Sequence, residues 1–566
     1  MKIEHDRLPA PPSRSFLLAV LILLSFLTAV MTYPQVFHMR DGVNDRGDPL
    51  LNAWAMAWVA HQLPIAPARL FDANIFYPER HTLALSETLL LPAVVLAPVQ
   101  WAGGGSILAY NLALIGALIL SGVGIALLVG ELTGRAEAAI VSAIIFAFLP
   151  FRFDHYPHLQ LQQTEFIPLA LWALHRVVRT ARRADVVKLG VFAACQFLSC
   201  VYFGVFLVPY LAVMAASLLI PDFRLSRVEG GLLLSGDFGA FGRRILGLAV
   251  AAAIALVIVA PTARAYLLAS RDVGQRAAAE VAIGNARLTD YLAPGENNVL
   301  YQPWASRFGG PEHRLFPGLV AALLAVVALW PPWSRIRIAY GLALLFAFDM
   351  SRGFDGLSYG WLYDNFLPLR AIRVPDRMGL MVGFTLAVLA GYGVDRLSAA
   401  AGSSRSRRVL VAAILSALIL FEYRSHPLGL TIVPMVPPAV YQDLLRDRGD
   451  APPVAIVELP FAQEDPTFMY YSTFHWQYLL NGYSGFFTQA FLHLITDLNN
   501  FPDDTAMSAL RRHIARYVVI HGEWLSSAEY ERLVAAANRR PDLKFVAQRQ
   551  WQGARISLYR VLYGVR

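Results

Sequence analysis

The chain has 566 residues, of which 56% are hydrophobic and only 16% are charged. Soluble globular domains contain about 25% charged residues, so this composition excludes an ordinary soluble protein and indicates a membrane protein. The formal net charge is +8, which would suit a nucleic-acid-binding protein. However, the Lys and Arg residues lie beside hydrophobic segments, where they orient membrane spans. We therefore expect no nucleic-acid partner.

Hydrophobic segments recur throughout the first 424 residues. Nearly uncharged stretches cover 16–33, 107–130, 245–263, 315–330, 379–394 and 408–421. Such lengths suit membrane helices. The first stretch follows Lys2, Arg7 and Arg14 without a clear small-residue cleavage site, so we interpret it as a retained span that enters from the cytoplasm. The sequence therefore predicts a mostly α fold, with a polytopic membrane helix bundle of about eleven spans over residues 1–424.

Basic loops set the expected topology. The segment 176–188 is the most basic loop, and Arg243 with Arg244, 335–337 and 405–408 are basic too. Placing all of them in the cytoplasm leaves four loops on the outer face, together with everything after Tyr423. These loops are 34–106, 152–165, 267–313 and 351–377. The count of crossings then requires that 85–102, with one glutamate and two prolines, lies in the outer face without crossing.

Residues 425–566 are mixed and polar, and they predict a small α/β domain on the extracytoplasmic side. VAIVELP (454–460) and RYVVIHG (516–522) have the composition of short buried strands. Ser526 and Glu529 have the spacing of a capping box before a helix. Two further strands, joined by Trp551, Gln552 and Gly553, predict a terminal hairpin.

The first outer loop contains three carboxylates, Asp41, Asp45 and Asp48, within eight positions. Asp48-Pro49 is expected to begin an amphipathic helix at the membrane interface, which carries two tryptophans. Crowded carboxylates at a membrane surface repel one another and lose solvation, so one of them is a candidate base. A solvated acidic turn, with Asp48 capping the helix, is the alternative interpretation.

The second outer loop, RFDHYPHLQLQQTE, places four polar candidates between two apolar spans: Asp154, His155, His158 and Glu165. The two histidines are three positions apart, which would allow a divalent metal, but Pro157 interrupts the helix that such a site needs. Ordinary interfacial histidines are the favoured interpretation. We expect this loop to line a polar cavity that faces Asp48.

Arginines in the fourth outer loop run against the usual charge rule. LPLRAIRVPDRM carries Arg370, Arg373 and Arg377 at a membrane boundary. A guanidinium group chelates phosphate oxygens, so these residues are candidates for a lipid-phosphate site, with contact to ordinary anionic headgroups as the alternative. Other candidate substrate-binding residues are Glu87 in the first outer loop and Glu312 and His313 at a span entrance.

Taken together, these blocks resemble the GT-C superfamily of integral membrane glycosyltransferases, in particular the bacterial members that use polyprenyl-phosphate sugars. The blocks are GDPLLNAW, IFYPERHTLALSE, PFRFDHYPHLQLQ, LFPG, IRVPDR and NGYSGF. The resemblance implies a multi-pass protein of the bacterial inner membrane that binds membrane lipids and a polyprenyl-phosphate-linked sugar. It also implies inverting sugar transfer on the outer face without an obligate cofactor, although a divalent metal stays possible.

By motif position, the resemblance assigns the base to Asp48 and a second acidic site to Asp154, while Asp41 and Asp45 compete for the first role. Two other classes of protein stay open. A lipid-linked glycan transporter or flippase would also expose charged outer loops, but it should show internal repeats and charged residues in the middle of the membrane. A non-catalytic membrane protein of envelope assembly would keep the same frame without activity.

Overall fold

The computed structural model describes residues 10–219, 224–228, 231–235, 238–274, 276–305, 307–310, 313–400, 402 and 404–563. The chain divides into two compact units. We call the first the helical unit, which comprises Met1–Val36, Ala113–Ala260 and Gln275–Leu428. The second is the mixed unit, which comprises Phe37–Leu112, Pro261–Gly274 and Gly429–Arg566.

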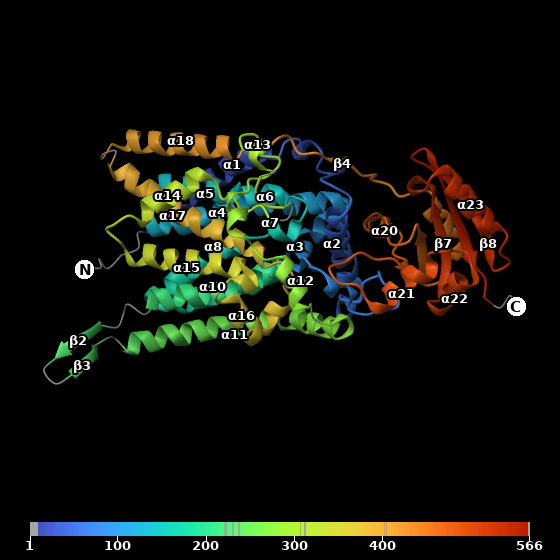
Figure 1. Ribbon diagram of the computed structural model, residues 1–566, viewed down its shortest axis with the longest axis horizontal. Coiled ribbons are helices and arrows are strands. Elements are labelled where there is room, and N and C mark those ends of the chain that lie inside the picture. The colour runs from blue at the N-terminus through green and yellow to red at the C-terminus, as the bar shows by residue number, and fades with distance from the viewer. Residues whose placement is uncertain are drawn as a thin grey trace. The chain divides into compact units, whose positions relative to one another are not determined.

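Long apolar helices dominate the helical unit (Figure 1). In the described part of the chain, six segments are long and apolar enough to cross a membrane: Arg14–Met31 (α1), Ser106–Thr133 (α4), Ala136–Asp154 (α5 and α6), Val201–Leu219 (α10), Phe238–Val273 (α11) and Pro375–Ala400 (including α17). The further helices of 11 residues or more are α8 (Phe166–Thr180), α9 (Arg183–Ser199), α14 (Leu319–Leu329), α15 (Arg335–Ser351) and α18 (Arg405–Glu422). The prediction of a polytopic helix bundle is confirmed. The predicted number of about eleven spans includes these five helices, which are shorter or more charged. That they cross the membrane stays a prediction.

The core of the helical unit forms around α17 (Gly379–Ala400), most of whose residues are buried. Small residues let its backbone approach its neighbours closely, as is usual between membrane helices. A Cβ atom on Gly393 would lie 2.2 Å from the carbonyl oxygen of Leu324 on α14. Because that contact is with backbone, no larger residue fits at 393 without moving one helix.

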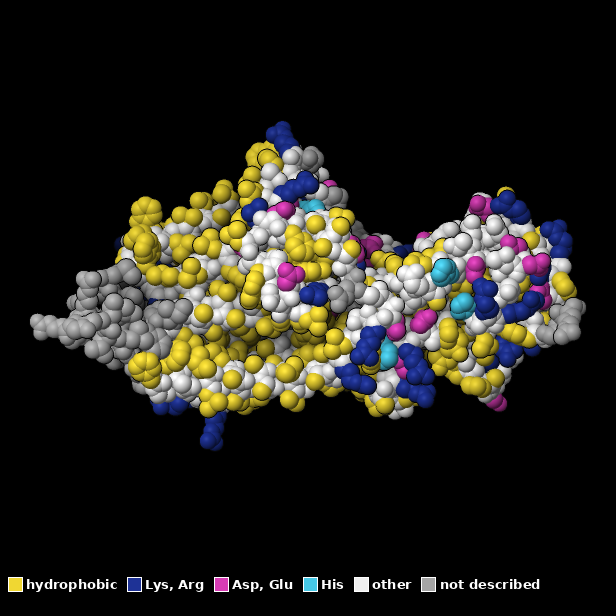
Figure 2. Space-filling model, turned by 60° about the horizontal axis from the view of Figure 1, so that its bottom comes forward, with side chains coloured by type: hydrophobic (Ala, Val, Ile, Leu, Met, Phe, Trp, Pro, Cys, Tyr) yellow, Lys and Arg dark blue, Asp and Glu magenta, His cyan; other side chains and the backbone are white. Residues whose placement is uncertain are grey.

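Apolar side chains also face outward from the same unit. Leu18, Ile22 and Phe26 on α1 are more than half exposed, and so are Leu256 and Val257 on α11. Figure 2 shows one face of the molecule, on which hydrophobic side chains gather with few charges among them over the part that the long helices form. Exposed apolar area of this extent is costly in water, so it suits a lipid environment.

Short helices connect the long ones in the helical unit. They are α6 (Pro150–Asp154), α7 (Leu159–Gln162), α12 (Ala278–Ile283), α13 (Gln302–Ala305) and α16 (Tyr359–Asn365). Strands β2 (Arg224–Val228) and β3 (Gly231–Ser235) form an antiparallel hairpin before α11. Several of these short helices fall in the predicted outer loops, where the candidate site residues lie.

The mixed unit begins with β1 (Gly42–Val43) and α2 (Asp48–Ile65), and β1 pairs with β4 (Thr431–Ile432). Helix α2 begins at the predicted residue, but all of its residues from Pro49 to Ala60 are buried. It is therefore a core helix and not the amphipathic surface helix that we expected. Helix α3 (Leu90–Trp101) has 12 residues, a length of about 18 Å. That is shorter than a hydrocarbon core of about 30 Å, but α14, which the predicted spans include, has only 11 residues. That 85–102 does not cross therefore stays a prediction.

The C-terminal part of the mixed unit is a five-stranded mixed sheet in the order β6-β5-β7-β9-β8. Strand β5 pairs in parallel with β6 and β7, whereas β9 pairs antiparallel with β7 and β8. The strands are β5 (Ala455–Leu459), β6 (Tyr478–Leu479), β7 (Ala515–His521), β8 (Leu543–Trp551) and β9 (Ala554–Val561). The helices are α19 (Val440–Arg448), α20 (Asp465–Ser472), α21 (Gln489–Leu498), α22 (Asp504–Arg512) and α23 (Ser527–Asn538). The predicted α/β fold of this part is confirmed (Figure 1).

Local sequence signals explain several of these elements. Ser526 and Glu529 form the predicted capping box at the start of α23. Gln552 and Gly553 both have positive φ, 47° and 82°, which is the backbone of a two-residue hairpin turn that follows the twist of the strands. The terminal hairpin therefore forms where the sequence predicted it.

Candidate functional site

The predicted site residues fall in both units. The mixed unit contains the acidic residues of the first outer loop: Asp41, Asp45, Asp48 and Glu87. The helical unit contains the others: Asp154, His155, His158, Glu165, His313, Arg370, Arg373 and Arg377. Glu312 lies outside the described residues.

The acidic residues of the first outer loop have different surroundings. A carboxylate oxygen of Asp41 lies 3.3 Å from Nδ1 of His38, within hydrogen-bond distance. One carboxylate oxygen of Asp45 accepts a hydrogen bond of 2.7 Å from the backbone N–H of Gly47, which closes the turn before α2. Glu87 is half-buried in the segment before α3. Asp41 and Asp45 therefore contribute to local structure.

Asp48 is the first residue of α2, and its side chain is half-buried. The hydroxyl of Tyr483 donates a hydrogen bond of 3.3 Å to its Oδ1 atom. The N-terminus of a helix carries partial positive charge, which favours an ionised carboxylate at this position. Pro49 follows at a position where its missing N–H costs no hydrogen bond. The local sequence thus places Asp48 at the start of a buried helix, where the helix dipole favours the charged form.

A cavity of 470 Å³ is lined by Tyr483, whose hydroxyl is bonded to Asp48, and by Gly47, which precedes Asp48; Asp48 itself is not a lining residue. Its lining also includes the charged residues Arg46, Glu464 and Asp465, and an apolar wall of Phe487, Phe491, Leu492 and Ile495. The volume falls within the range of small-molecule sites. A ligand in this cavity would meet polar groups on one side and an apolar wall on the other.

Asp465 is a second acidic group at this cavity, and sequence reasoning missed it. Burial raises the pKa of Asp465 to about 7, although hydrogen bonds from Asn481 and Gly482 oppose the shift. Asn481 Nδ2 donates at 2.9 Å. Both partners belong to the NGYSGF segment, which also supplies Tyr483. The sequence signal that could have identified Asp465 was this segment, together with the Asp465-Pro466 pair that begins α20.

In the helical unit, buried polar side chains fix the predicted loop 152–165. The fully buried guanidinium of Arg152 donates to the carbonyl oxygens of Phe146 at 2.9 Å and Gln162 at 3.1 Å, and also to the hydroxyl of Thr164. In return, Gln162 Nε2 donates to the carbonyl oxygens of Arg152 and His155. This double attachment holds the loop against the end of α5, because the Arg152 guanidinium and the Gln162 amide group each bond backbone carbonyl oxygens.

Asp154 lies where this loop meets the segment after residue 292. Its carboxylate accepts a hydrogen bond from the backbone of Glu296 and interacts electrostatically with Arg314. Arg314 in turn forms an ion pair with Glu296. A Cβ atom on Gly295 would lie 2.5 Å and 2.8 Å from the two carboxylate oxygens of Asp154, so only glycine allows the backbone this close. Glu296 was missed by sequence reasoning, although it is an acidic residue in a predicted outer loop.

His155 is buried and neutral. Burial lowers its pKa to about 3, and electrostatic interactions with His158 and Arg377 act in the same direction. Its Nδ1 lies 3.0 Å from the carbonyl oxygen of Phe151, so Nδ1 carries the proton and Nε2 is the acceptor. The rings of His155 and His158 are 5.8 Å apart. Across the described ranges, no three His, Cys, Asp or Glu side chains are grouped to hold a metal ion. The described residues therefore supply no set of ligands for the divalent metal that the sequence left open.

Glu165 lies at the other end of the loop, immediately before α8. Burial raises the pKa of Glu165 to about 7, while backbone hydrogen bonds and the charge of Arg152 oppose the shift. The polar residues of this loop therefore stand in an environment with little water. Its role as a substrate-binding residue stays a prediction.

The three arginines of the fourth outer loop do three different things. Arg370 donates to the carbonyl oxygens of Tyr363 and Asp364, both at 3.1 Å, and so caps the end of α16. Arg377 is buried, with its guanidinium 4.7 Å from the ring centre of Tyr202. Arg373 is exposed, and its guanidinium has no partner within the described ranges. Only Arg373 offers a free guanidinium fork.

His313 and Asp376 connect two of the predicted outer loops. Nδ1 of His313 lies 2.6 Å from Oδ2 of Asp376, whose side chain is 1% exposed. Asp376 belongs to the IRVPDR block and precedes Arg377. Sequence reasoning placed neither Asp376 nor Tyr202 in the site, because these contacts join positions that are far apart in the chain. Within the helical unit, His155 interacts electrostatically with His158, Arg377 and Arg314, and Arg314 also interacts with Asp154. His313 is paired with Asp376, the residue before Arg377.

Solved structures similar to this chain include membrane glycosyltransferases. The mycobacterial arabinofuranosyltransferase AftD matches with a TM-score of 0.61 at 13% sequence identity, over 98% of this chain and 42% of AftD. The chain has a GT-C-like fold. It spans less than half the length of AftD.

Weaker matches are the oligosaccharyltransferase AglB from Archaeoglobus fulgidus, solved with an inhibitory peptide and a dolichol-phosphate, and ArnT from Cupriavidus metallidurans. AglB has a TM-score of 0.49 at 12% identity, over 92% of this chain and 71% of AglB. Apo ArnT has a TM-score of 0.48 at 11% identity, over 96% of this chain and 97% of ArnT. No protein-family model matches the sequence, and no curated protein does.

Proposed function

We propose that this protein is a membrane glycosyltransferase that moves a sugar from a polyprenyl-phosphate donor to an acceptor hydroxyl on the extracytoplasmic face, with inversion at the anomeric carbon. The observation that carries the proposal is the Asp48 carboxylate at the start of α2, which accepts a hydrogen bond from Tyr483, a lining residue of the cavity of 470 Å³. The GT-C-like fold, shared with an arabinofuranosyltransferase, supports glycosyl transfer over transport.

The proposed reaction is a single displacement. The acceptor oxygen attacks the anomeric carbon, the bond from that carbon to the phosphate oxygen breaks, and the lipid phosphate leaves with the electron pair. Asp48 takes the acceptor proton, for which it must lie within hydrogen-bond reach of the hydroxyl. Positive charge stabilises the leaving phosphate. For this contact we keep the candidate that the sequence indicated, Arg373, which is exposed and has no partner among the described residues of the helical unit.

Asp48→Asn tests the base. The amide keeps the shape of the side chain and can still accept the hydrogen bond of Tyr483, but it takes no proton. We expect single-turnover transfer from a radiolabelled polyprenyl-phosphate sugar to fall by about 10²- to 10⁴-fold, with donor binding unchanged. Asp41→Asn is the matched control, because Asp41 pairs with His38. If Asp48→Asn keeps wild-type turnover, then Asp48 is not the base, and Asp45 and Asp465 become the next candidates. If none of these carboxylates matters, the transferase proposal is wrong.

Arg373→Ala tests the phosphate contact. Losing one charge-assisted hydrogen bond costs about 1.5–3 kcal/mol, so donor affinity should fall by roughly 10- to 100-fold, with little change in turnover at saturating donor. Arg370→Ala is the matched control, since its guanidinium already caps α16. It should lower thermal stability but leave donor affinity unchanged. Equal donor affinities for the two variants would contradict the assignment of Arg373.

A further inference from the structure

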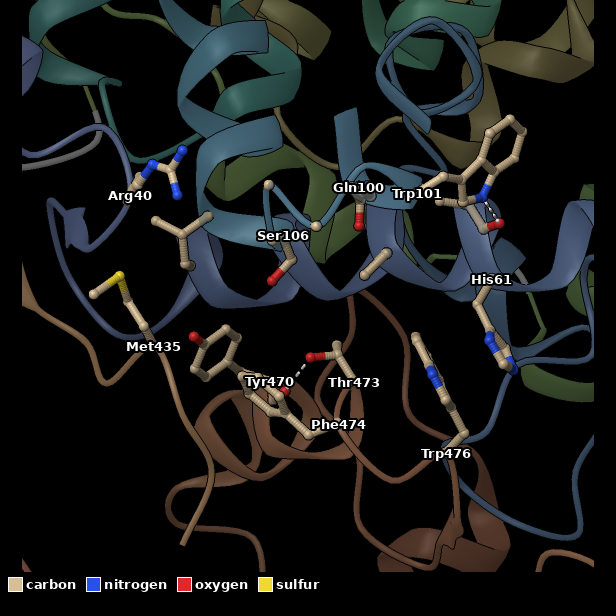
Figure 3. Close-up of a pocket in the computed structure, with 16 residues that line it drawn as sticks. Arg40, His61, Gln100, Trp101, Ser106, Met435, Tyr470, Thr473, Phe474 and Trp476 are labelled. Carbon is tan, nitrogen blue, oxygen red and sulfur yellow. Dashed lines mark hydrogen bonds between the residues drawn. The ribbon is translucent and has the colours of Figure 1, made fainter. Parts of the chain in front are cut away.

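A second cavity lies within the mixed unit and shares no lining residue with the cavity that Tyr483 lines. Its volume is 480 Å³. One wall comes from α2, the end of α3 and the start of α4, and the other comes from α20 and the residues that follow it. Figure 3 shows the two walls as two rows of side chains, with Arg40, Ser106, Gln100 and Trp101 facing Tyr470, Thr473, Phe474 and Trp476.

Aromatic side chains make up much of this lining. Tyr470, Phe474 and Trp476 lie on one wall and Trp101 on the other (Figure 3). One face of the Trp476 ring is covered by His61, which stacks on it with ring centres 4.0 Å apart and planes 11° apart. The indole of Trp101 is fixed by a hydrogen bond of 2.9 Å to the carbonyl oxygen of Ala60. Rings held in this way keep their orientation without a ligand, so binding does not have to order them.

Trp476 is also held in an uncommon backbone conformation. Its φ is 53°, which is the left-handed region that bulky residues rarely adopt. The adjoining turn supports it, because Nδ1 of His475 accepts a hydrogen bond of 3.1 Å from the N–H of Gln477. Backbone strain of this kind is stored mainly at functional sites.

The remaining lining is polar and open. Arg40 is exposed, and its guanidinium has no partner in the part of the chain that the structure describes. Burial lowers the pKa of His61, so its ring is neutral and offers one donor and one acceptor. Gly103 and Gly105 have positive φ, and a Cβ atom on either would meet nothing within 4 Å. The cavity thus combines rings, neutral hydrogen-bonding groups and one cation.

We propose that this cavity binds an anionic saccharide, with a sugar ring on the aromatic wall and its acidic group at Arg40. The negative face of an aromatic ring attracts the positively polarised C–H groups on one side of a sugar. The side chains of Gln100, Tyr470 and Thr473 already donate to carbonyl oxygens, so their oxygen atoms are the groups left to accept hydrogen bonds from sugar hydroxyls. Arg40 can chelate a carboxylate or phosphate. An acyl chain offers no donor to these oxygen atoms, whereas a saccharide does. The inference goes beyond the proposed transfer reaction, because it concerns binding alone.

The test measures binding of two tetrasaccharides to the full chain in phosphatidylcholine nanodiscs. The acidic probe alternates glucuronic acid with N-acetylglucosamine, and the neutral probe contains N-acetylglucosamine only. We expect the acidic probe to bind more tightly. Trp476→Ala should weaken both probes by about tenfold or more, and Trp476→Phe should restore most of the affinity because it keeps a ring. Arg40→Gln should weaken the acidic probe alone, to the level of the neutral one.

The matched control is Trp361→Ala, which removes an exposed tryptophan of the helical unit and should change neither affinity. Arg40 is exposed, so Arg40→Gln keeps the test valid if Trp476→Ala does not fold. The proposal is overturned if neither probe binds, if Trp476→Ala and Arg40→Gln bind as the wild type does, or if both probes bind equally. It is also overturned if phosphatidylglycerol in the nanodisc displaces the acidic probe, since the cavity would then take a lipid headgroup.

Discussion

Single residues decide which carboxylates in this protein are available for chemistry. Asp41 and Asp45 sit within eight positions of Asp48, yet one pairs with His38 and the other closes a turn. The arginines of the fourth outer loop also differ in their surroundings, because Arg370 caps a helix while Arg373 is exposed. Identical side chains therefore differ in role because of the groups that surround them.

Gly295 gives a test of the Asp154 position. In Gly295→Ala, the new Cβ would come within 3 Å of both carboxylate oxygens, so the short Asp154 side chain must rotate away from the Glu296 backbone. We expect single-turnover transfer to fall by roughly 10- to 100-fold, as a displacement of about 1 Å can cause, with a stability loss of at most about 1–3 kcal/mol.

Gly310→Ala is the control in the same outer loop, because the nearest atom would lie at 3.8 Å. Measured in an Asp154→Asn background, Gly295→Ala should add little, since both changes act on one carboxylate. Wild-type turnover in Gly295→Ala would show that the position of Asp154 does not matter for transfer.

At the scale of elements, the C-terminal sheet contains a buried charge network between two parallel strands. Nε2 of His521 on β7 lies 2.8 Å from Glu458 on β5, and its Nδ1 lies 2.9 Å from Glu523. With a carboxylate at each ring nitrogen, both nitrogens must donate, so the imidazole is charged. Burial alone would lower the pKa of His521, but Glu523 and Glu458 outweigh it and raise the pKa to about 9.

This shift makes the sheet sensitive to pH. A histidine whose pKa is raised by folding binds its proton more tightly in the folded state, so the stabilisation is complete below about pH 6.5 and is lost as pH rises through about 9. We expect the protection of β5 and β7 amides to weaken over this window by on the order of 2–3 kcal/mol. Hydrogen exchange on the full chain, corrected for intrinsic rates, measures it.

The double variant His521→Gln with Glu458→Gln supplies the comparison, because it keeps the packing and removes this titration. Its protection should show little change between pH 6.5 and 9, whatever its absolute stability. An equally steep loss in the variant would assign the pH dependence to other groups.

At the scale of the whole molecule, the helical unit has the composition and exposed apolar surface of a membrane domain, and the chain has a GT-C-like fold. The orientation in the membrane stays a prediction from the basic loops. It places 34–106 and 425–566 outside and 176–188 inside. The structure helps to choose reporters, because Asn74 is buried and a cysteine there would not react.

Exposed alanines are better reporters. In a variant without Cys195 and Cys200, single cysteines at Ala68, Ala184 and Ala528 occupy exposed positions. With an impermeant thiol reagent on intact cells, we expect labelling at Ala68→Cys and Ala528→Cys, and labelling at Ala184→Cys only after the cells are opened. If Ala68→Cys and Ala528→Cys label differently, the predicted topology is wrong.

Short-range rules let the sequence determine the membrane class, the start of α2 at Asp48-Pro49, the Ser526 capping box and the Gln552-Gly553 turn. Each of these depends on hydrophobic length or on backbone preferences within a few residues. Only the tertiary structure decided that α2 is buried, that Tyr483 holds Asp48 across 435 positions, and that Gly295 and Glu296 meet Asp154. Such contacts depend on how distant segments pack, which no local pattern encodes, and so the sequence named the carboxylates but not their partners.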